Sequence, residues 1–150
     1  MEMGFSVDSN NFWLGLRNMF EIASVQHKGK CELVLAGKRK DNGQWMKVVL
    51  SGFSLGSAAE NYKLNFDDVI EREGTNIPTS SFKPHKGSPF STKDRDNDGH
   101  SVNCAKRFKG GWWYENSNCY YVSFNGDDVW QESNGWVYFS ETRMWIRIKS

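Results

Sequence analysis

The 150-residue sequence lacks several features on which large classes of protein depend. No apolar run approaches the ~18 residues of a membrane span. No basic segment followed by an apolar stretch opens the chain, so no signal peptide is visible. Charge of one sign is lacking too, because 19 Lys and Arg face 18 Asp and Glu. This balance argues against a nucleic-acid binder, which needs a basic surface to contact phosphates.

Cysteine is scarce and aromatic residues are abundant. Three cysteines are too few for a disulfide scaffold, but they allow one bridge and one remaining thiol. Phe, Trp and Tyr together number 22, as many as Val, Leu and Ile together. Ala and Leu, which favour helices, are sparse. The composition therefore predicts a single domain of strands and loops with a core rich in aromatic rings.

Short apolar segments separated by turn residues predict the strands. Cys31–Ala36 and Gln44–Leu50 flank Asn42-Gly43, the strongest short-range signal for a β-hairpin. The remaining segments predict a short strand or turn at Asn11–Leu16, a strand at Asn61–Phe66, a long loop region over Glu71–Lys93, and two strands at Trp136–Phe139 and Met144–Ile148.

An acidic run, Lys93–Gly99, has carboxylates at every second position. Asp94, Asp96 and Asp98 alternate, and Gly99 follows them. Carboxylates spaced in this way in a coil can converge on one calcium ion. The run is not an EF-hand, because Ala105 stands where the bidentate Glu is required. From the residues alone two interpretations stay open: a calcium site, or an acidic turn neutralised by the two basic residues of the run.

The segment Gly52–Gly56 matches the G-x-S-x-G pattern of serine hydrolases. In that interpretation Ser54 is the nucleophile and His85 or His100 is the base. The motif needs a strand-to-helix elbow in a parallel α/β sheet, and this chain lacks the alternating pattern of such a fold. We therefore favour a chance match and no enzymatic activity, and we expect the scattered histidines to lie at the surface or in loops.

Cys104 and Cys119 bracket an aromatic, Gly-rich segment. A bridge between them would stabilise the chain by roughly 3 kcal/mol. Paired glycines and three consecutive aromatic residues in Phe108–Tyr114 suggest a packed or ligand-facing platform. We expect at least one of Trp112 and Trp113 to belong to the core.

Taken together, the segments Pro89–Asp98, Asn103–Ala105, Gly110–Tyr114, Cys119 and Asn125-Gly126 resemble the fibrinogen C-terminal domain. The resemblance covers nearly the whole chain. It implies an α+β fold, with a twisted antiparallel sheet, short helices and a loop-rich, calcium-binding C-terminal subdomain. The sheet would occupy about residues 1–80 and the calcium- and ligand-binding part about 81–150. The N-terminal subdomain of the family would be absent.

The resemblance also implies a calcium site and a disulfide. Asp96 and Asp98 would bind Ca²⁺ through their side chains, and His100 and Val102 through their carbonyl oxygens. Asp94 would be a nearby acceptor. Cys104 would pair with Cys119, and Cys31 would be a free thiol or an intermolecular link.

In lectin-like members of this family, such as ficolins and tachylectins, a pocket binds N-acetyl groups. Here the amide of Cys119 would be the donor, aimed by a cis peptide between Asn118 and Cys119. Phe108 and Trp136 would form the walls, and Tyr120 replaces the usual His after the second cysteine. Tyr114 and Trp130 would surround the same pocket, whereas Trp13, Trp45, Tyr62, Trp145 and Phe12 would pack the sheet. Some aromatic surface near the start, including Phe5 and Phe12, would be more exposed than its residue types suggest.

Two functions follow as expectations. The first is a secreted, calcium-supported lectin for acetylated carbohydrate in innate immunity. The second is a protein-binding module in cell adhesion or receptor signalling, with a cell-surface glycoprotein as partner; Tyr120 and a shortened 126–135 loop favour it somewhat. Neither needs nucleic acid or membrane insertion, and any oligomer would form through regions outside this chain.

Overall fold

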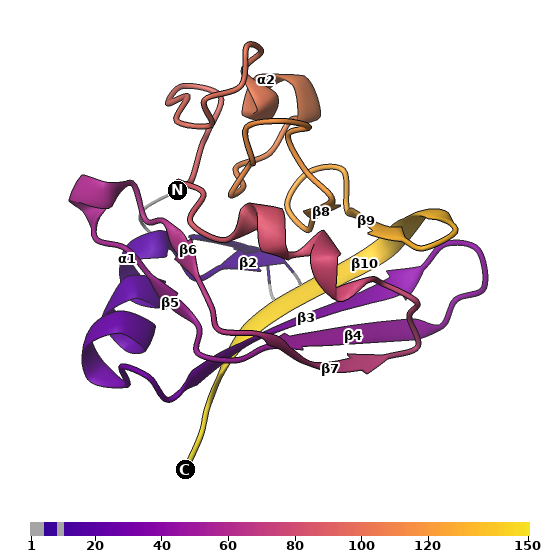
Figure 1. The fold of residues 1–150 in the computed structure, drawn as a ribbon, viewed down its shortest axis with the longest axis horizontal. Coiled ribbons are helices and arrows are strands. Elements are labelled where there is room, and N and C mark those ends of the chain that lie inside the picture. Colours follow the sequence, from indigo (N-terminus) through magenta and orange to yellow (C-terminus); the bar gives the residue numbers. More distant parts are fainter. Residues whose placement is uncertain (1–4, 9–10) are drawn as a thin grey trace.

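A six-stranded antiparallel sheet forms the base of the molecule (Figure 1). The computed structural model describes the backbone of residues 5–8 and 11–150, and the side chains from Trp13 onward except that of Thr79. The strand order is β7-β4-β3-β10-β9-β8. The bounds are β3 (Cys31–Arg39), β4 (Trp45–Leu50), β7 (Val69–Glu73), β8 (Val122–Ser123), β9 (Val129–Glu132) and β10 (Gly135–Ile148). The predicted fold class, an antiparallel sheet with few short helices, is confirmed.

Smaller elements pack beside this sheet. Two short ladders pair β1 (Phe5–Asp8) with β2 (Asn11–Trp13) and β5 (Ser54–Leu55) with β6 (Leu64–Asn65). The helices are α1 (Leu16–Phe20), which continues as a π-helical turn over Glu21–Gln26, α2 (Cys104–Phe108), and 3-10 turns at Ala58–Glu60, Thr79–Ser81 and Lys83–His85. The sequence did not predict α1, because a helix this short shows no apolar periodicity.

The predicted hairpin of β3 and β4 is confirmed. Leu35 pairs with Val48, and Lys38 with Trp45, across the turn. Gly43 has φ +71°, a conformation that its lack of a Cβ permits. Residues 31–37 are buried on both faces of the sheet, which explains why β3 reads as a continuous apolar run.

The C-terminal strand differs from the prediction. One continuous strand, β10, replaces the two expected at Trp136–Phe139 and Met144–Ile148. Residues 135–138 pair with β9, and residues from Phe139 onward pair with β3, in a ladder whose register shifts between Phe139 and Glu141. The polar residues at this irregularity interrupt the apolar pattern, so the sequence looks like two strands.

Two further expectations need correction. Asn61 and Tyr62 have left-handed φ of 53° and 51°, so the strand expected at Asn61–Phe66 shrinks to β6. The loop expected over Glu71–Lys93 begins inside β7, which continues to Glu73 and pairs with β4.

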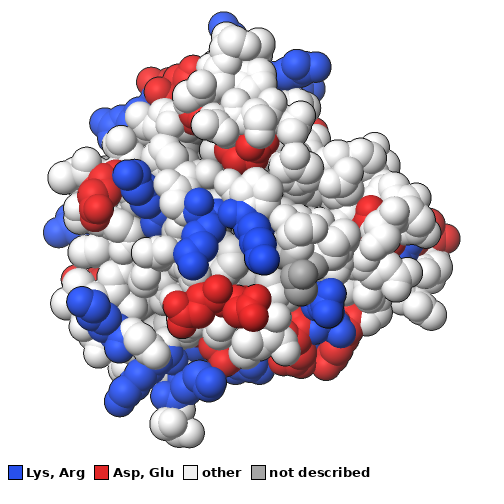
Figure 2. Space-filling view, in the orientation of Figure 1, with Lys and Arg blue, Asp and Glu red and all other residues white. Residues whose placement is uncertain are grey.

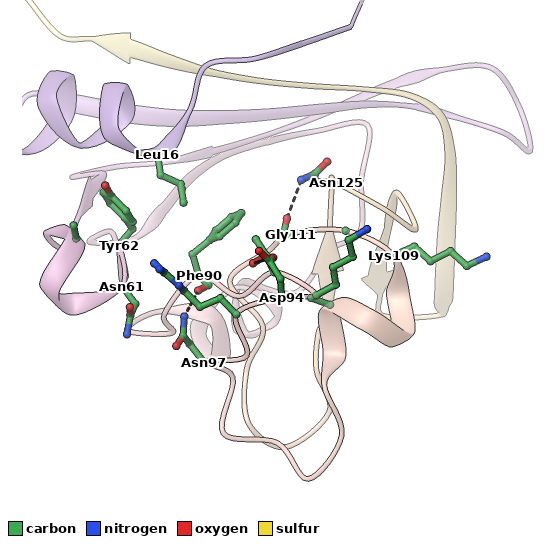
Figure 3. A pocket seen from close by; sticks show the side chains of 15 residues that line it. Leu16, Asn61, Tyr62, Phe90, Asp94, Asn97, Lys109, Gly111 and Asn125 are labelled. Carbon is green, nitrogen blue, oxygen red and sulfur yellow. Dashed lines mark hydrogen bonds between the residues drawn. The ribbon is translucent and has the colours of Figure 1, made fainter. Parts of the chain in front are cut away.

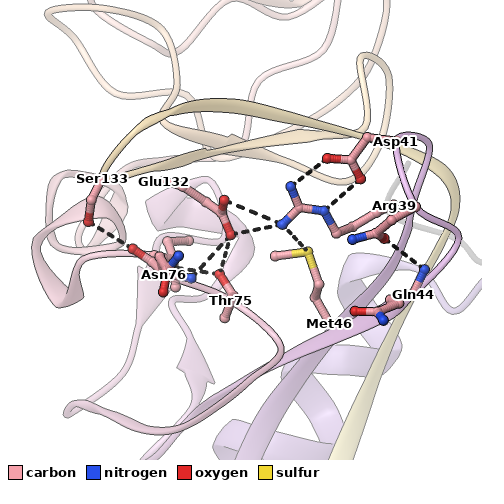
Figure 4. Close-up of polar contacts among 10 residues, drawn as sticks. Arg39, Asp41, Gln44, Met46, Thr75, Asn76, Glu132 and Ser133 are labelled. Atoms are coloured by element: carbon pink, nitrogen blue, oxygen red, sulfur yellow. Dashed lines mark hydrogen bonds and ion pairs between the residues drawn. The ribbon is translucent and has the colours of Figure 1, made fainter.

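A buried carboxylate ties the loop after β7 to the sheet (Figure 4). Glu132 in β9 accepts hydrogen bonds from the Thr75 hydroxyl at 3.0 Å and the Asn76 N–H at 3.1 Å. The Arg39 guanidinium of β3 lies 3.3 Å from the same carboxylate and 2.6 Å from Asp41. Hydrogen-bonded charge pairs of this kind hold the loop in place where no strand pairing does.

The loop-rich part of the chain follows β7 in the sequence and precedes β10, and it lies on one side of the sheet (Figure 1). Its core is aromatic: Trp113, Trp130 and Tyr114 are fully buried. The proposed pocket roles of Tyr114 and Trp130 are therefore wrong, while the core role of Trp112 and Trp113 is confirmed. Residues 135–148 lie in the sheet as β10, beyond the expected boundary at about residue 80.

The opposite face of the sheet is covered by its own long side chains. Val34 and Val49 are buried there outside the main core. Trp45 and Trp145, expected to pack the sheet, are 41% and 43% exposed. The Arg143 guanidinium lies 4.7 Å from the Trp45 ring centre, a cation–π contact. The side chains of Phe5 and Phe12 lie outside the described residues.

Basic and acidic side chains are interspersed on the face shown in Figure 2, with no field of one sign across it. This agrees with the formal net charge of +1. None of the helices in the described part of the chain is long and apolar enough to cross a membrane.

Candidate functional site

The predicted disulfide joins the helix α2 to the loop before β8. Cys104 and Cys119 are bonded, with Cα atoms 5.7 Å apart. Asn103 caps α2 by accepting the Lys106 N–H at 2.8 Å. Cys31 is a buried free thiol, the first of the two states expected for it. Burial raises the pKa of this thiol.

The acidic loop is organised around Asp98, which is 3% exposed. One carboxylate oxygen accepts the His100 N–H at 2.8 Å, and the other accepts the Cys104 N–H at 3.0 Å. The exposed Asp96 accepts the Asp98 N–H at 3.3 Å. Asp94 instead accepts the Thr92 hydroxyl at 2.7 Å, outside this arrangement.

These residues fit a hard cation. The predicted donors are all oxygens, the type that Ca²⁺ prefers, and Asp98 and Asp96 sit on one tight loop. Each Asp98 oxygen is engaged by one N–H and keeps a further lone pair. A nearby trio of His100, Cys104 and Cys119 has ligand atoms within 4.8 Å of one another, but its two cysteines are oxidised and offer no thiolate. Calcium at Asp96, Asp98, His100 and Val102 stays a prediction.

The predicted wall residues do meet in space. The Tyr120 ring lies edge-on between Phe108, at 4.7 Å between ring centres, and Trp136, at 5.7 Å. Trp136 is 44% exposed, and the Arg107 guanidinium lies 5.3 Å from the Phe108 ring centre. We call Phe108, Tyr120 and Trp136 the aromatic cluster.

An acidic residue fixes the central ring of this cluster. The Tyr120 hydroxyl donates to Asp127 at 2.7 Å. Burial, the hydrogen bond to Asp127 and the charge of that carboxylate raise the pKa of Tyr120. Tyr120 therefore stays neutral, and its ring fills the space between the two walls where an acetyl group was expected.

The loop before Cys119 also differs from the expectation. The peptide between Asn118 and Cys119 is trans, so the predicted cis bond is wrong, and Cys119 instead has φ +68°. Glu115 closes this loop by accepting the Ser117 N–H at 2.9 Å and the Asn118 N–H. Burial raises the pKa of Glu115, but the Ser117 hydroxyl, which donates to it at 2.6 Å, and these two N–H groups keep that pKa below its usual range.

His85, expected at the surface or in a loop, is buried in the loop-rich core. Its Nδ1 lies 2.9 Å from the Trp113 carbonyl, and its Nε2 accepts the N–H groups of Tyr121 at 3.1 Å and Val122 at 3.3 Å. The ring is therefore neutral, with its proton on Nδ1. Burial lowers the pKa of His85. A single His among loop residues carries no sequence pattern that would have revealed this role.

A cavity of about 660 Å³ lies between α1 and the acidic loop (Figure 3). Phe90 and Leu16 supply its apolar part, and Asp94, Asn97 and Lys109 supply its polar part. It does not include the aromatic cluster, and sequence reasoning had not assigned it.

Ser54 is not a nucleophile on an elbow. It lies in β5 and pairs with Asn65 in a two-residue antiparallel ladder. The match to G-x-S-x-G is therefore a coincidence of sequence.

An aromatic surface beside a disulfide-closed acidic loop, on an antiparallel sheet, defines a binding module. The chain belongs to the family described as fibrinogen beta and gamma chains, C-terminal globular domain, whose model matches residues 1–150. This membership makes it a non-enzymatic module. The family that the sequence resembled is confirmed.

Individual relatives agree with this assignment. Tenascin-R of Gallus gallus is 38% identical over 83% of this chain but only 8% of its own length. Human angiopoietin-related protein 6 is 31% identical over 93% of this chain and 28% of its own length. The chain therefore spans a small part of these relatives.

Solved structures show the same fold. The fibrinogen-like globe domain of human ANGPTL6 superposes with a TM-score of 0.80 at 28% identity, over 99% of this chain and 69% of that one. The lamprey fibrin D-dimer, solved with the peptide Gly-His-Arg-Pro-amide, gives 0.75 at 21% identity over 95% of this chain and 53% of that one.

Proposed function

We propose that this chain is an extracellular recognition module that binds a protein partner through the aromatic cluster. The observation that carries the proposal is the contact of Phe108, Tyr120 and Trp136 at the surface, in a family of binding modules. The half-exposed Trp136, the partly buried Tyr120 and the neighbouring Arg107 are of the residue types that dominate protein interfaces. The disulfide suits an oxidising, extracellular setting.

The similarity to tenascin-R and angiopoietin-related protein 6 supports a protein partner over an acetylated carbohydrate. So does Tyr120, whose ring occupies the space between the expected walls. The competing function is an acetyl-binding lectin of innate immunity. It predicts that acetylated sugars displace the partner.

We also propose that the acidic loop binds Ca²⁺ through Asp96 and Asp98, with the carbonyls of His100 and Val102. When bound, the ion would supply positive charge beside the buried Asp98 carboxylate. Asp98 in turn holds the N–H of Cys104, one end of the disulfide, so the loop supports the platform of the aromatic cluster.

The test is binding of the intact chain to a panel of purified cell-surface and matrix proteins. Trp136→Ala should weaken each specific interaction roughly tenfold or more, as expected for a tryptophan at an interface centre. Trp45→Ala is the matched control, because Trp45 is equally exposed on the far face of the sheet. Equal binding by both variants would refute the site. Displacement of the partner by N-acetylglucosamine would support the lectin instead.

A further inference from the structure

Two arginine side chains pack on aromatic rings, and they differ in how their charge is matched. On the far face of the sheet, Arg143 lies 4.7 Å from the Trp45 ring centre and donates to the Glu141 carboxylate at 2.7 Å. In α2, Arg107 lies 5.3 Å from the Phe108 ring centre. Within the described residues, Arg107 forms no ion pair with a carboxylate. The charge of Arg107 is therefore available to a group outside this chain.

Its position suits Arg107 for binding a carboxylate. A guanidinium that packs on a ring keeps its N–H donors in one plane, where two of them can bond both oxygens of a carboxylate. Its hydration is weak compared with that of a lysine ammonium, so less free energy is lost when a partner displaces the water. Phe108 belongs to the aromatic cluster, and Arg107 therefore places an anion-binding group at the edge of that cluster.

The neighbours of Arg107 in the chain add to its charge. Lys106 and Lys109 are exposed, and neither forms an ion pair among the residues that the structure describes. The α2 side of the aromatic cluster consequently carries three cations in four residues, 106–109, without carboxylate partners of their own. An acidic group on a partner would complement this surface.

The carboxylates in the loop between β8 and β9 have other partners. Asp127 accepts the Tyr120 hydroxyl at 2.7 Å. Asp128 is only partly exposed and interacts with Thr142 and with the backbone of Gly126. Neither forms an ion pair with the cations of α2, so the positive charge at this end of the cluster is not cancelled within the described chain.

Exposed rings lie beside this positive surface. Trp136 and Tyr138 are alternate residues of β10 and therefore lie on the same face of the strand, where they are 44% and 57% exposed. Tyr138 contributes, after burial and Asp127, to the raised pKa of Tyr120, so its ring lies near the aromatic cluster. A partner can therefore place an apolar side chain on these rings while an acidic neighbour reaches α2.

We propose that Arg107 selects a partner segment in which a carboxylate adjoins an aromatic or large aliphatic side chain. The carboxylate would bond the Arg107 guanidinium, and the apolar side chain would pack on Trp136. Lys106 and Lys109 would favour further acidic residues in the segment. This inference rests on the proposed function, because it names the chemistry of the partner that the aromatic cluster binds.

The test uses two synthetic peptides, acetylated and amidated at their ends: Gly-Glu-Trp-Glu-Gly and Gly-Lys-Trp-Lys-Gly. Each is titrated into the isotope-labelled intact chain, and NMR follows the Trp136 indole N–H and the Arg107 Nε–H. The acidic peptide should bind more tightly, by about fivefold, and should shift both signals. Added salt should reduce the preference, because exposed charges are screened.

Variants of the protein identify the group responsible. Arg107→Gln should remove the preference for the acidic peptide, and Arg107→Lys should keep only part of it, because lysine has the charge without the planar fork. Arg143→Gln is the matched control: Arg143 also packs on a tryptophan ring, but it lies on the far face and is bonded to Glu141. It should leave the preference unchanged.

The outcomes separate this inference from the proposed function. A preference for the lysine peptide that is lost in Asp127→Asn would place a cation at the cluster and overturn the inference. A preference for the acidic peptide that survives Arg107→Gln would overturn it as well. If Trp136→Ala weakens both peptides while Arg107→Gln changes neither, the binding site stands and the charge selection fails. If Trp136→Ala changes neither peptide, the proposed function fails too.

Discussion

The sheet and the loop-rich part of this molecule keep their backbones hydrogen-bonded in different ways. In β3, β4 and β10 the strand ladders satisfy the backbone N–H and C=O groups. Aliphatic side chains such as Leu35 and Val48 fill the core on one face of the sheet. Between Glu73 and Val129 regular structure is sparse, and buried polar side chains hold the chain instead. A protein of this size can therefore stabilise long irregular segments if each buried backbone group finds a side-chain partner.

Three titratable side chains carry much of this role. Asp98 accepts two backbone N–H groups, Glu115 accepts two more, and the neutral His85 ring bonds three backbone groups. The loop-rich part should therefore respond to pH and to single polar substitutions, whereas the sheet should respond to lost apolar volume.

The largest effect is expected for Asp98→Ala in the presence of a chelator. The variant leaves the N–H groups of His100 and Cys104 without their acceptor, at about 1–3 kcal/mol each, so we expect a loss of about 4 kcal/mol. Urea unfolding followed by tryptophan fluorescence measures it. Asp96→Ala is the control and should cost less than about 1 kcal/mol under the same conditions, because Asp96 is exposed. Equal losses would show that burial of the carboxylate is unimportant.

Leu35→Ala is the corresponding destabilising substitution in the sheet. It removes buried apolar volume from a residue that is 1% exposed, and we expect a loss of about 3 kcal/mol. The same unfolding measurement applies. The difference from wild type should be the same at pH 7 and pH 5.5 and with or without calcium. A loss that changed with pH would mean that the two regions are not distinct in this respect.

Calcium sharpens the comparison, because the proposed site lies only in the loop-rich part. At a calcium concentration 100 times the dissociation constant, binding to the native state adds about 2.7 kcal/mol. Thermal unfolding in calcium and in chelator should reveal this difference. Asp96→Asn should remove most of it, and Asp94→Asn, the matched control, should keep it. An unchanged difference in Asp96→Asn would exclude that residue as a ligand.

The smallest predicted effect is a pH dependence due to His85. Because the pKa of His85 is lowered in the folded state, the unfolded chain binds the proton more readily below about pH 6.5. Stability should be complete above that pH and fall by up to about 1.4 kcal/mol per unit as the pH decreases toward the folded pKa. Glu115, whose pKa is depressed, acts in the same direction but only below its ordinary value of 4.5.

His85→Leu separates these contributions. The variant should be less stable at pH 7, because three backbone groups lose their partner, but its stability should no longer change between pH 6.5 and pH 5. Unfolding free energies at four pH values would show this. A slope that persists in the variant would assign the pH dependence to another group.

The sequence predicted those parts of the molecule in which local signals and spatial outcome coincide. Asn42-Gly43 specified its hairpin without help from distant residues, and the family motif placed Phe108, Tyr120 and Trp136 together. Burial of individual rings could not be predicted: Tyr114 and Trp130 lie in the core, while Trp45 and Trp145 lie half-exposed on the far face. Packing between distant segments decides this, and residue type alone does not.

Other features depend on contacts that leave no pattern. The role of His85 comes from segments 28 and 36 residues away, at Trp113 and Tyr121. The continuity of β10 is hidden by the register shift between Phe139 and Glu141 in its ladder with β3.

The position of β10 has a consequence for the order of folding. Its pairing with β3 joins residues as far apart as Cys31 and Ile148, 117 positions along the chain. The centre of the sheet therefore cannot close until β10 is available, and contacts this distant in sequence form slowly because the intervening chain must first be ordered. During synthesis β3 and β4 would remain an isolated hairpin until β10 is made. The edge of β3 that later pairs with β10 would meanwhile be exposed to other chains.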